Sequence, residues 1–402
     1  MKFVNHKWLR IALINLNIIA LIGVVLRYKI AFSLPFIDQK QLLQGHSHFA
    51  FAGWITQALM ALLVDYLYRS GNENAYKKYA WILIANLITA YGMLAAFPVA
   101  GYNIFSITFS TLCVFVSYIF TVVYWKDLNK LKRDAVSHLW FKAALVFNVM
   151  SSLGAFSLAY MMANQLVQQK WYLSSIYFFL HFQYNGWFFF ACMGLLMGKL
   201  YTLGIVNEAF KKIFWLFLIA CAPAYFLSVL WMSIPIWVYW IVVFSALAQV
   251  GAWIWLVKII APIKKNISTL GKVLLIVSGI ALSVKLLLQL GSTYPPLSNL
   301  AFGFRPIVIG YLHLVLLGVI TVFILGYIVS QKLILLTKIS KIGIIIFTFG
   351  IFFNELLLMV QGIAALKYES VPYINEMLLF AALIMFIGTA LLVRGQFRTM
   401  LN

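Results

Sequence analysis

Charged residues, acidic ones above all, are scarce in this chain of 402 residues. Only 10% of the residues are charged and nine are Asp or Glu, whereas 64% are hydrophobic and the mean hydropathy is +0.98. Soluble domains are about half apolar and about a quarter charged. No polar stretch exceeds roughly 20 residues, which leaves no room for a sizeable soluble domain. The composition therefore indicates a membrane protein.

Cysteine and proline are also rare. The three cysteines, Cys113, Cys192 and Cys221, all lie in apolar segments and form no Cys-x-x-Cys pair, which argues against disulfides and thiolate metal sites. Only Pro98 and Pro223 fall well inside apolar segments. The sequence therefore gives little sign of the broken helices that are typical of many transporters.

Apolar segments of about 20 residues, the length that crosses a bilayer as a helix, recur along the chain. They predict an all-α polytopic protein with about twelve spans, at 8–28, 46–68, 79–101, 103–125, 138–163, 172–199, 213–233, 234–258, 270–291, 306–329, 342–364 and 374–396. No small-residue cleavage site follows the first segment, so we expect it to be a retained helix and not a signal peptide.

The net charge of +21 favours a membrane topology over nucleic-acid binding. Of the 30 Lys and Arg residues, 22 lie at the amino terminus, in alternate loops and in the tail, and only six lie in the other loops. This is the positive-inside pattern. It predicts that both termini are cytoplasmic, that the chain lies in the bacterial inner membrane with the lipid bilayer as its main partner, and that it binds no nucleic acid.

The same short pattern occurs in each third of the chain. His48, His181 and His313 are each followed by Gly at the fifth position after them, and the intervals from 48 to 181 and from 181 to 313 are nearly equal. A second pair, His6 and His138, is separated by almost the same interval, and a Trp stands at the second position after each. The spacing predicts one domain, 1–402, made of three pseudo-equivalent four-helix units at about 1–134, 135–266 and 267–402.

The three repeated histidines are candidate ligands. Ionisable residues inside a membrane are costly and commonly mark functional sites, although each His can equally well hydrogen-bond a neighbouring helix. Imidazoles without thiolates or clustered carboxylates suit haem iron, copper or zinc. His46 is two residues from His48, about 200° around a helix, so the two side chains face different neighbours. His6 and His138 are expected to be interfacial anchors beside their Trp residues.

Other ionisable residues fall within or beside the spans. Lys285 and Glu355 are predicted either to form an ion pair inside the bundle or to relay protons. Alternatively, Lys285 and Arg305 would be counter-charges for an anion such as a haem propionate.

The architecture, together with histidines on the second, sixth and tenth helices near the outer side, resembles subunit I of the haem–copper oxidases. The resemblance implies that His48 (or His46) and His313 are axial ligands of a haem, most simply of the b type, and that His181 lies on the copper side. The segment 213–233 contains no His, where the oxidases carry a His pair, and Asn185 stands where many oxidases have Tyr. The usual three-His copper site cannot be assembled from these positions.

The segment Gly45-His46-Ser47-His48 is similar to the His-x-His of the smaller NnrS-type haem–copper membrane proteins. Phe49 follows the pair, where an acidic residue is usual in that family. This resemblance implies a haem protein, with or without copper, that handles a small gas such as O2 or NO or passes electrons, with a redox partner or other membrane subunits. If it is an enzyme, it is an oxidoreductase.

Two other functions are compatible with the same residues. The histidines could line the path of a metal-ion or small-anion transporter, with Lys285 and Glu355 inside. Alternatively, the chain could be a non-catalytic oxidase-like subunit or an assembly factor that keeps the fold without the chemistry.

Overall fold

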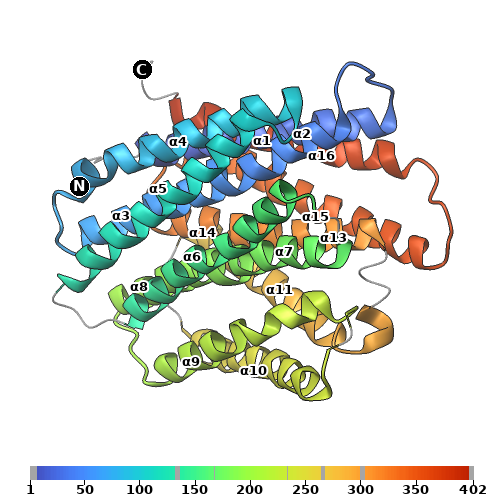
Figure 1. Ribbon diagram of the computed structural model, residues 1–402. Helices are drawn as coiled ribbons and strands as arrows, with labels where there is room; N and C mark the ends of the chain where they lie inside the picture. The colour runs from blue at the N-terminus through green and yellow to red at the C-terminus, as the bar shows by residue number, and fades with distance from the viewer. Residues whose placement is uncertain are drawn as a thin grey trace. The chain divides into compact units, whose positions relative to one another are not determined.

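The protein is described by a computed structural model for residues 7–131, 136–166, 168–232, 234–263, 268–298 and 304–397. His6 lies outside these ranges, and so does the side chain of Arg305. The described residues form helices and contain no β-strand, as the composition predicts (Figure 1).

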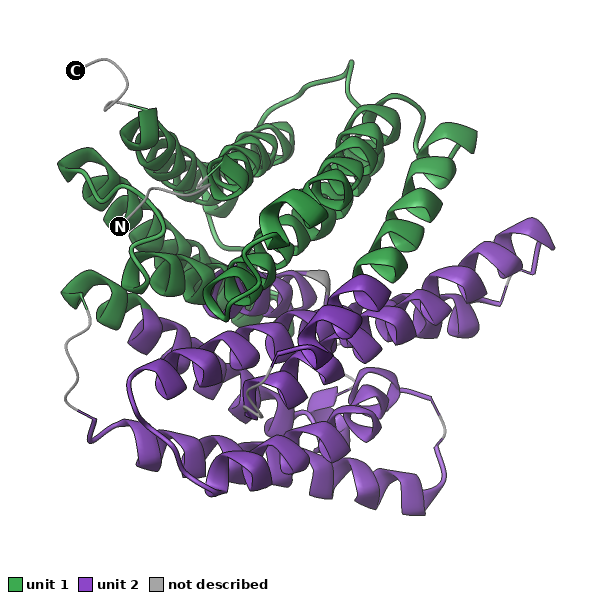
Figure 2. Cartoon of the chain, turned by 90° about the vertical axis from the view of Figure 1, so that its left-hand side faces the viewer, with its two compact units in different colours: residues 1–120, 268–274, 321–402 green, residues 121–267, 275–320 purple. Residues whose placement is uncertain are grey.

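The chain divides into two compact units, shown in green and purple in Figure 2. Unit 1 comprises residues 1–120, 268–274 and 321–402, and unit 2 comprises residues 121–267 and 275–320. The helices of unit 1 are α1 (Lys7–Ala31), α2 (Gln39–Phe49), η1 (Ala50–Thr56), α3 (Gln57–Arg69), α4 (Ala75–Ala100), α14 (Val322–Ser330), α15 (Lys338–Leu366) and α16 (Ile374–Phe397).

Unit 2 contains most of the remaining helices. These are α6 (Val136–Ala163), α7 (Gln169–His181), η2 (Phe182–Phe188), α8 (Phe189–Thr202), α9 (Ala209–Cys221), η3 (Pro223–Val229), α10 (Ile236–Ile260) and α13 (Arg305–His313). The boundary between the units falls inside three further helices, α5 (Ile104–Asn129), α11 (Thr269–Gly291) and η4 (Leu314–Thr321).

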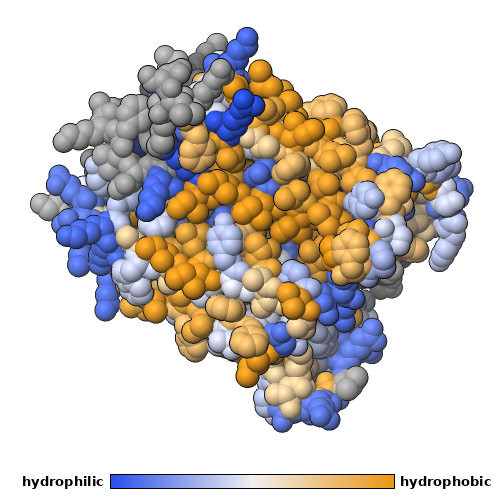
Figure 3. Space-filling model, turned by 90° about the horizontal axis from the view of Figure 1, so that it is seen from above, coloured by the Kyte–Doolittle hydropathy of each residue, from blue (hydrophilic) through white to orange (hydrophobic). Residues whose placement is uncertain are grey.

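The helices of the described residues are those of a multi-pass membrane protein. Ten are long and apolar enough to cross a bilayer, and an eleventh is added if α9 and η3, which meet at a bend of 41°, form one span. The face seen in Figure 3 is covered mainly by hydrophobic side chains, with hydrophilic ones gathered toward its left and right margins. Exposed apolar side chains such as Ile88 and Phe352 fit contact with lipid.

The observed helices follow the predicted apolar segments closely, with two clear differences: the predicted segment 213–233 is broken between α9 and η3, and the second helix starts earlier than predicted. The helix predicted to begin at residue 46 begins at Gln39, because the Asp38 side chain accepts a hydrogen bond of 2.8 Å from the Gln41 backbone N–H. A carboxylate at this position satisfies an amide that would otherwise lack a partner, so the helix starts about two turns early. The histidines are therefore carried on an established helix and do not lie at its first turn.

Helices α15 and α16 pack at unusually short range in unit 1. A Cβ added at Gly388 would lie 2.5 Å from the backbone nitrogen of Phe347, and one at Gly343 would lie 2.5 Å from that of Leu392. Small residues allow helix backbones to approach in this way, which favours helix association in membranes.

Candidate functional site

A π-helical segment follows each of the three repeated histidines. η1 begins two positions after His48, η2 directly after His181 and η4 directly after His313. The segments begin at positions 50, 182 and 314, which are equally spaced along the chain. The wide turn of a π-helix is rare and occurs preferentially at functional sites.

Side chains from neighbouring helices support two of these π-helices. In unit 1, the amides of Asn15 on α1 and Asn86 on α4 donate to the carbonyl oxygens of Gly53 and Ala52 in η1. In unit 2, the Ser278 hydroxyl donates to a carbonyl oxygen of η4, that of Val319, at 2.7 Å. Buried backbone groups require such partners. The π-helical geometry is thus built into the packing of the adjacent helices.

His181 is a buried histidine with both ring nitrogens engaged. Its Nε2 lies 2.9 Å from the carbonyl oxygen of Cys221, and its Nδ1 lies 3.1 Å from Nδ2 of Asn185. A carbonyl can only accept, so Nε2 carries the proton, and Nδ1 then accepts from the amide of Asn185. His181 is 2% exposed. It therefore has the contacts of a structural histidine.

The carbonyl that His181 binds lies at the break between α9 and η3. Pro223 follows shortly after it, and the Tyr225 backbone N–H bonds to Ala222 in a tighter turn, so it does not reach the Cys221 carbonyl. Helix breaks inside a membrane are tolerated where neighbouring groups satisfy the freed backbone atoms. His181 performs this role, which sequence reasoning did not find. Asn185, on the same face of the helix one turn later, was the available signal.

His313 is held differently. Its Nδ1 lies 2.8 Å from the carbonyl oxygen of Ile309, one turn earlier on α13, so Nδ1 carries the proton and the lone pair is on Nε2. The side chain is half-buried. A histidine whose Nδ1–H donates to a backbone carbonyl is in the tautomer that ligates a metal through Nε2.

His46 and His48 pack against different helices of unit 1. The His48 ring stacks on Phe97 of α4, with centroids 4.3 Å apart and planes at 11°, and its Nε2 is 3.4 Å from the hydroxyl of Tyr102. The His46 ring lies on the α1 side, with Cε1 3.7 Å from where a Cβ on Gly23 would stand. The two side chains thus diverge, in line with their spacing along the helix.

The residues differ in how well they fit a metal or cofactor. Within the described ranges, no group of three or more His, Cys, Asp and Glu side chains is close enough together to hold a metal ion. Copper held by His181 does not fit, because both of its ring nitrogens already have partners. Haem iron, which takes one imidazole nitrogen per axial position, fits the tautomer of His313.

Lys285 and Glu355 each have a partner within their own unit. In unit 2, the Lys285 ammonium donates to Gln289 Oε1 at 2.6 Å, and Gln289 donates to Gln249 Oε1 at 2.8 Å. In unit 1, Glu355 accepts from the amide of Asn354 at 3.2 Å. The chain of two glutamine amides beside Lys285 was not foreseen, and it joins α10 to α11.

No protein-family model matches the chain, and a search of the curated proteins finds no match. The class of protein therefore rests on the fold, an all-helical chain with the helices of a multi-pass membrane protein.

Proposed function

We propose that the protein is an integral membrane haem protein in which His313 is an axial ligand of the iron. The observation that carries this proposal is the hydrogen bond from His313 Nδ1–H to the Ile309 carbonyl, which puts the ring in the tautomer that ligates through Nε2. The resemblance to oxidase subunit I and to the NnrS-type proteins supports it. A haem held in this way supplies electron transfer or binding of a small gas such as O2 or NO.

The resemblance also implies that His48, in unit 1, is a haem ligand, and His46 is not required. His48 is the member of the pair that shares its repeat position with His181 and His313, and it lies beside aromatic rings, an environment that suits a flat macrocycle. Copper is not assigned to His181. Arg305 remains a candidate partner for a haem propionate, because guanidinium groups bind carboxylates well.

The optical spectrum of the purified protein tests the haem. After expression with ample haem, the protein should show a Soret band and a reduced-minus-oxidised difference spectrum. His313→Ala and His48→Ala should each abolish or shift this spectrum, whereas His138→Ala, on the first turn of α6, should leave it unchanged. A purified protein without a Soret band, or an unaltered spectrum in both ligand variants, would overturn the proposal.

A transporter is the second candidate, because of the break at Pro223. The 41° bend between α9 and η3 is the kind of discontinuity that builds substrate sites in transporters, and the buried Lys285 belongs to the same unit. Uptake of a metal ion or small anion into proteoliposomes containing haem-free protein would favour this function. Haem-dependent redox activity without uptake would favour the first.

We further propose twelve spans in three four-helix units, with both termini on the cytoplasmic side of a bacterial inner membrane. The recurrence of π-helices at equal intervals supports the triplication, and the distribution of Lys and Arg supports the orientation. This count treats α9 with η3, and α7 with η2 and α8, as one span each. A reporter that is active only in the cytoplasm should be active when it is fused to either end of the chain. A reporter that is active only outside the cytoplasm should be inactive at both ends.

A further inference from the structure

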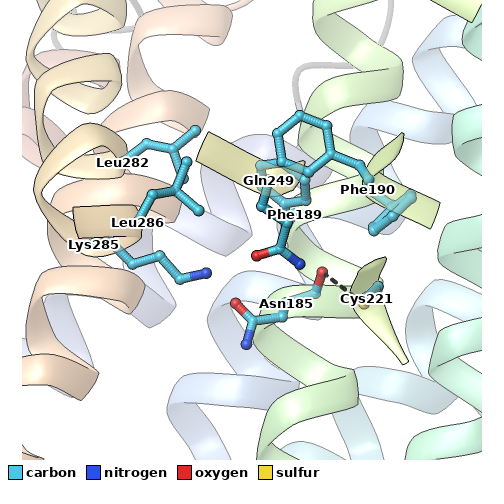
Figure 4. A pocket seen from close by; sticks show the side chains of 9 residues that line it. Asn185, Phe189, Phe190, Cys221, Gln249, Leu282, Lys285 and Leu286 are labelled. Atoms are coloured by element: carbon cyan, nitrogen blue, oxygen red, sulfur yellow. Dashed lines mark hydrogen bonds between the residues drawn. The ribbon is translucent and has the colours of Figure 1, made fainter. Parts of the chain in front are cut away.

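Unit 2 contains a small cavity beside a buried lysine. The cavity has a volume of about 10 Å³, enough for one water-sized occupant. Most of its wall is apolar, and the polar side chains of Lys285, Asn185 and Gln249 complete it. Figure 4 shows the amine of Lys285 and the amides of Asn185 and Gln249 pointing toward one another across this space.

The charge of Lys285 lacks a counter-charge among the described residues. Lys285 is 5% exposed, its ammonium donates to the neutral amide of Gln289, and no described carboxylate forms a salt bridge with it. An isolated ammonium costs several kcal/mol in an apolar interior unless an opposite charge is near. Two of the three N–H groups of the ammonium have no described acceptor.

Gln249, one of the two amides that line the cavity, has an NH2 group without a described acceptor. Gln249 receives the Gln289 amide on its oxygen, so its own NH2 group can turn to the cavity. Asn185 donates one N–H to His181, and Figure 4 shows its side-chain oxygen nearer than its nitrogen to the Lys285 amine. The polar part of the lining therefore consists of the Lys285 amine and the carboxamides of Gln249 and Asn185, and the rest is mainly Phe and Leu side chains.

We propose that this cavity binds one halide-sized monovalent anion, held by Lys285 and by the NH2 group of Gln249. The anion supplies the counter-charge that the described part of the chain lacks. The small volume excludes polyatomic anions such as sulfate. The proposal is independent of the haem proposal, because none of these residues is one of its ligands.

The test compares full-length protein in detergent in chloride, bromide and gluconate at equal ionic strength. Chloride and bromide should each raise the melting temperature over gluconate, by about 2 °C for each tenfold rise above Kd. Equilibrium binding of radioactive chloride should saturate at one ion per chain. Lys285→Met should abolish both effects. The matched control Lys142→Met, whose ammonium lies over the ring of Trp125 in the same unit, should retain both.

Gln249→Leu keeps the lysine and serves if Lys285→Met does not fold. It should weaken chloride binding by about tenfold, the cost of one hydrogen bond to a charged group. No chloride binding to the wild type would overturn the proposal and assign the cavity to water. Halide stabilisation that persists in Lys285→Met or is unaffected in Gln249→Leu would also overturn it, because the ion would then act elsewhere.

Discussion

At the scale of the residue, three histidines at equivalent sequence positions are in three different hydrogen-bonding states. Both ring nitrogens of His181 have protein hydrogen-bond partners, whereas the Nδ1–H of His313 donates to a backbone carbonyl of its own helix. The Nε2 of His48 lies 3.4 Å from the Tyr102 hydroxyl, and its ring stacks on Phe97. Sequence equivalence therefore does not imply equal function, and the ring nitrogen that carries the proton distinguishes a candidate ligand from a packing residue.

Replacement of His181 tests its structural role. His181→Leu leaves the Cys221 carbonyl and the Asn185 amide without partners, and the loss of these bonds should destabilise the protein by about 1–3 kcal/mol. Thermal unfolding of the detergent-solubilised protein measures this, and the loss should be the same with and without added copper. Stabilisation by copper that disappears in His181→Leu would instead make His181 a ligand.

At the scale of the element, the π-helices depend on side chains of neighbouring helices. Asn86 binds the Ala52 carbonyl and also Gln57, whereas Ser278 makes a single bond to Val319. Because hydrogen bonds between helices in membranes contribute on average about 0.6 kcal/mol each, the two sites should differ in strength.

Alanine substitutions measure that difference. Asn86→Ala should lower the free energy of unfolding by about 1–2 kcal/mol and Ser278→Ala by about 0.6 kcal/mol. Thr108→Ala is the control, because Thr108 bonds only within its own helix, to Ile104, and should cost less. Equal and negligible effects at Asn86 and Thr108 would show that η1 does not need this support.

The contact between α15 and α16 gives a second test at this scale. Gly388→Ala places a methyl group 2.5 Å from the Phe347 nitrogen, and the forced separation should cost about 1–3 kcal/mol. Gly251 on α10 has open space around it, so Gly251→Ala should instead stabilise the protein by up to about 1 kcal/mol. Melting temperatures that shift in the same direction for both variants would contradict the packing.

At the scale of the whole molecule, the distribution of positive charge predicts which loops face the cytoplasm. Lys130 and Lys170 are both exposed, and the positive-inside pattern puts them on opposite sides of the membrane. Among the native cysteines, Cys192 and Cys221 are buried and Cys113 is partly buried, so their background labelling should be low.

Cysteine labelling checks this orientation. A membrane-impermeant maleimide applied to the outer face should label Lys170→Cys, and Lys130→Cys should react only after the membrane is opened. The reverse pattern would show that the orientation is the opposite of the predicted one. Labelling of both cysteines from one side would show that no membrane span separates positions 130 and 170.

The sequence predicted most helix positions because a chain in lipid must satisfy its backbone within helices, so apolar length alone defines them. It also located the three histidine segments by their period. It did not predict the π-helices, because their geometry depends on polar side chains that reach over from other helices, such as Asn15 and Asn86. It did not predict the helix break either, although Pro223 was visible as an internal proline.

The sequence by itself determined the class of this protein, the positions of its helices and the residues worth testing, because composition and period are properties of the chain alone. The tertiary structure decided which of those residues can act as ligands. The protonated nitrogen of His181 is set by the Cys221 carbonyl, at a break in another helix. The two glutamines that extend the hydrogen-bond chain from Lys285 lie on two different helices. Hydrogen bonds between distant segments depend on how the helices pack, and no local pattern specifies them.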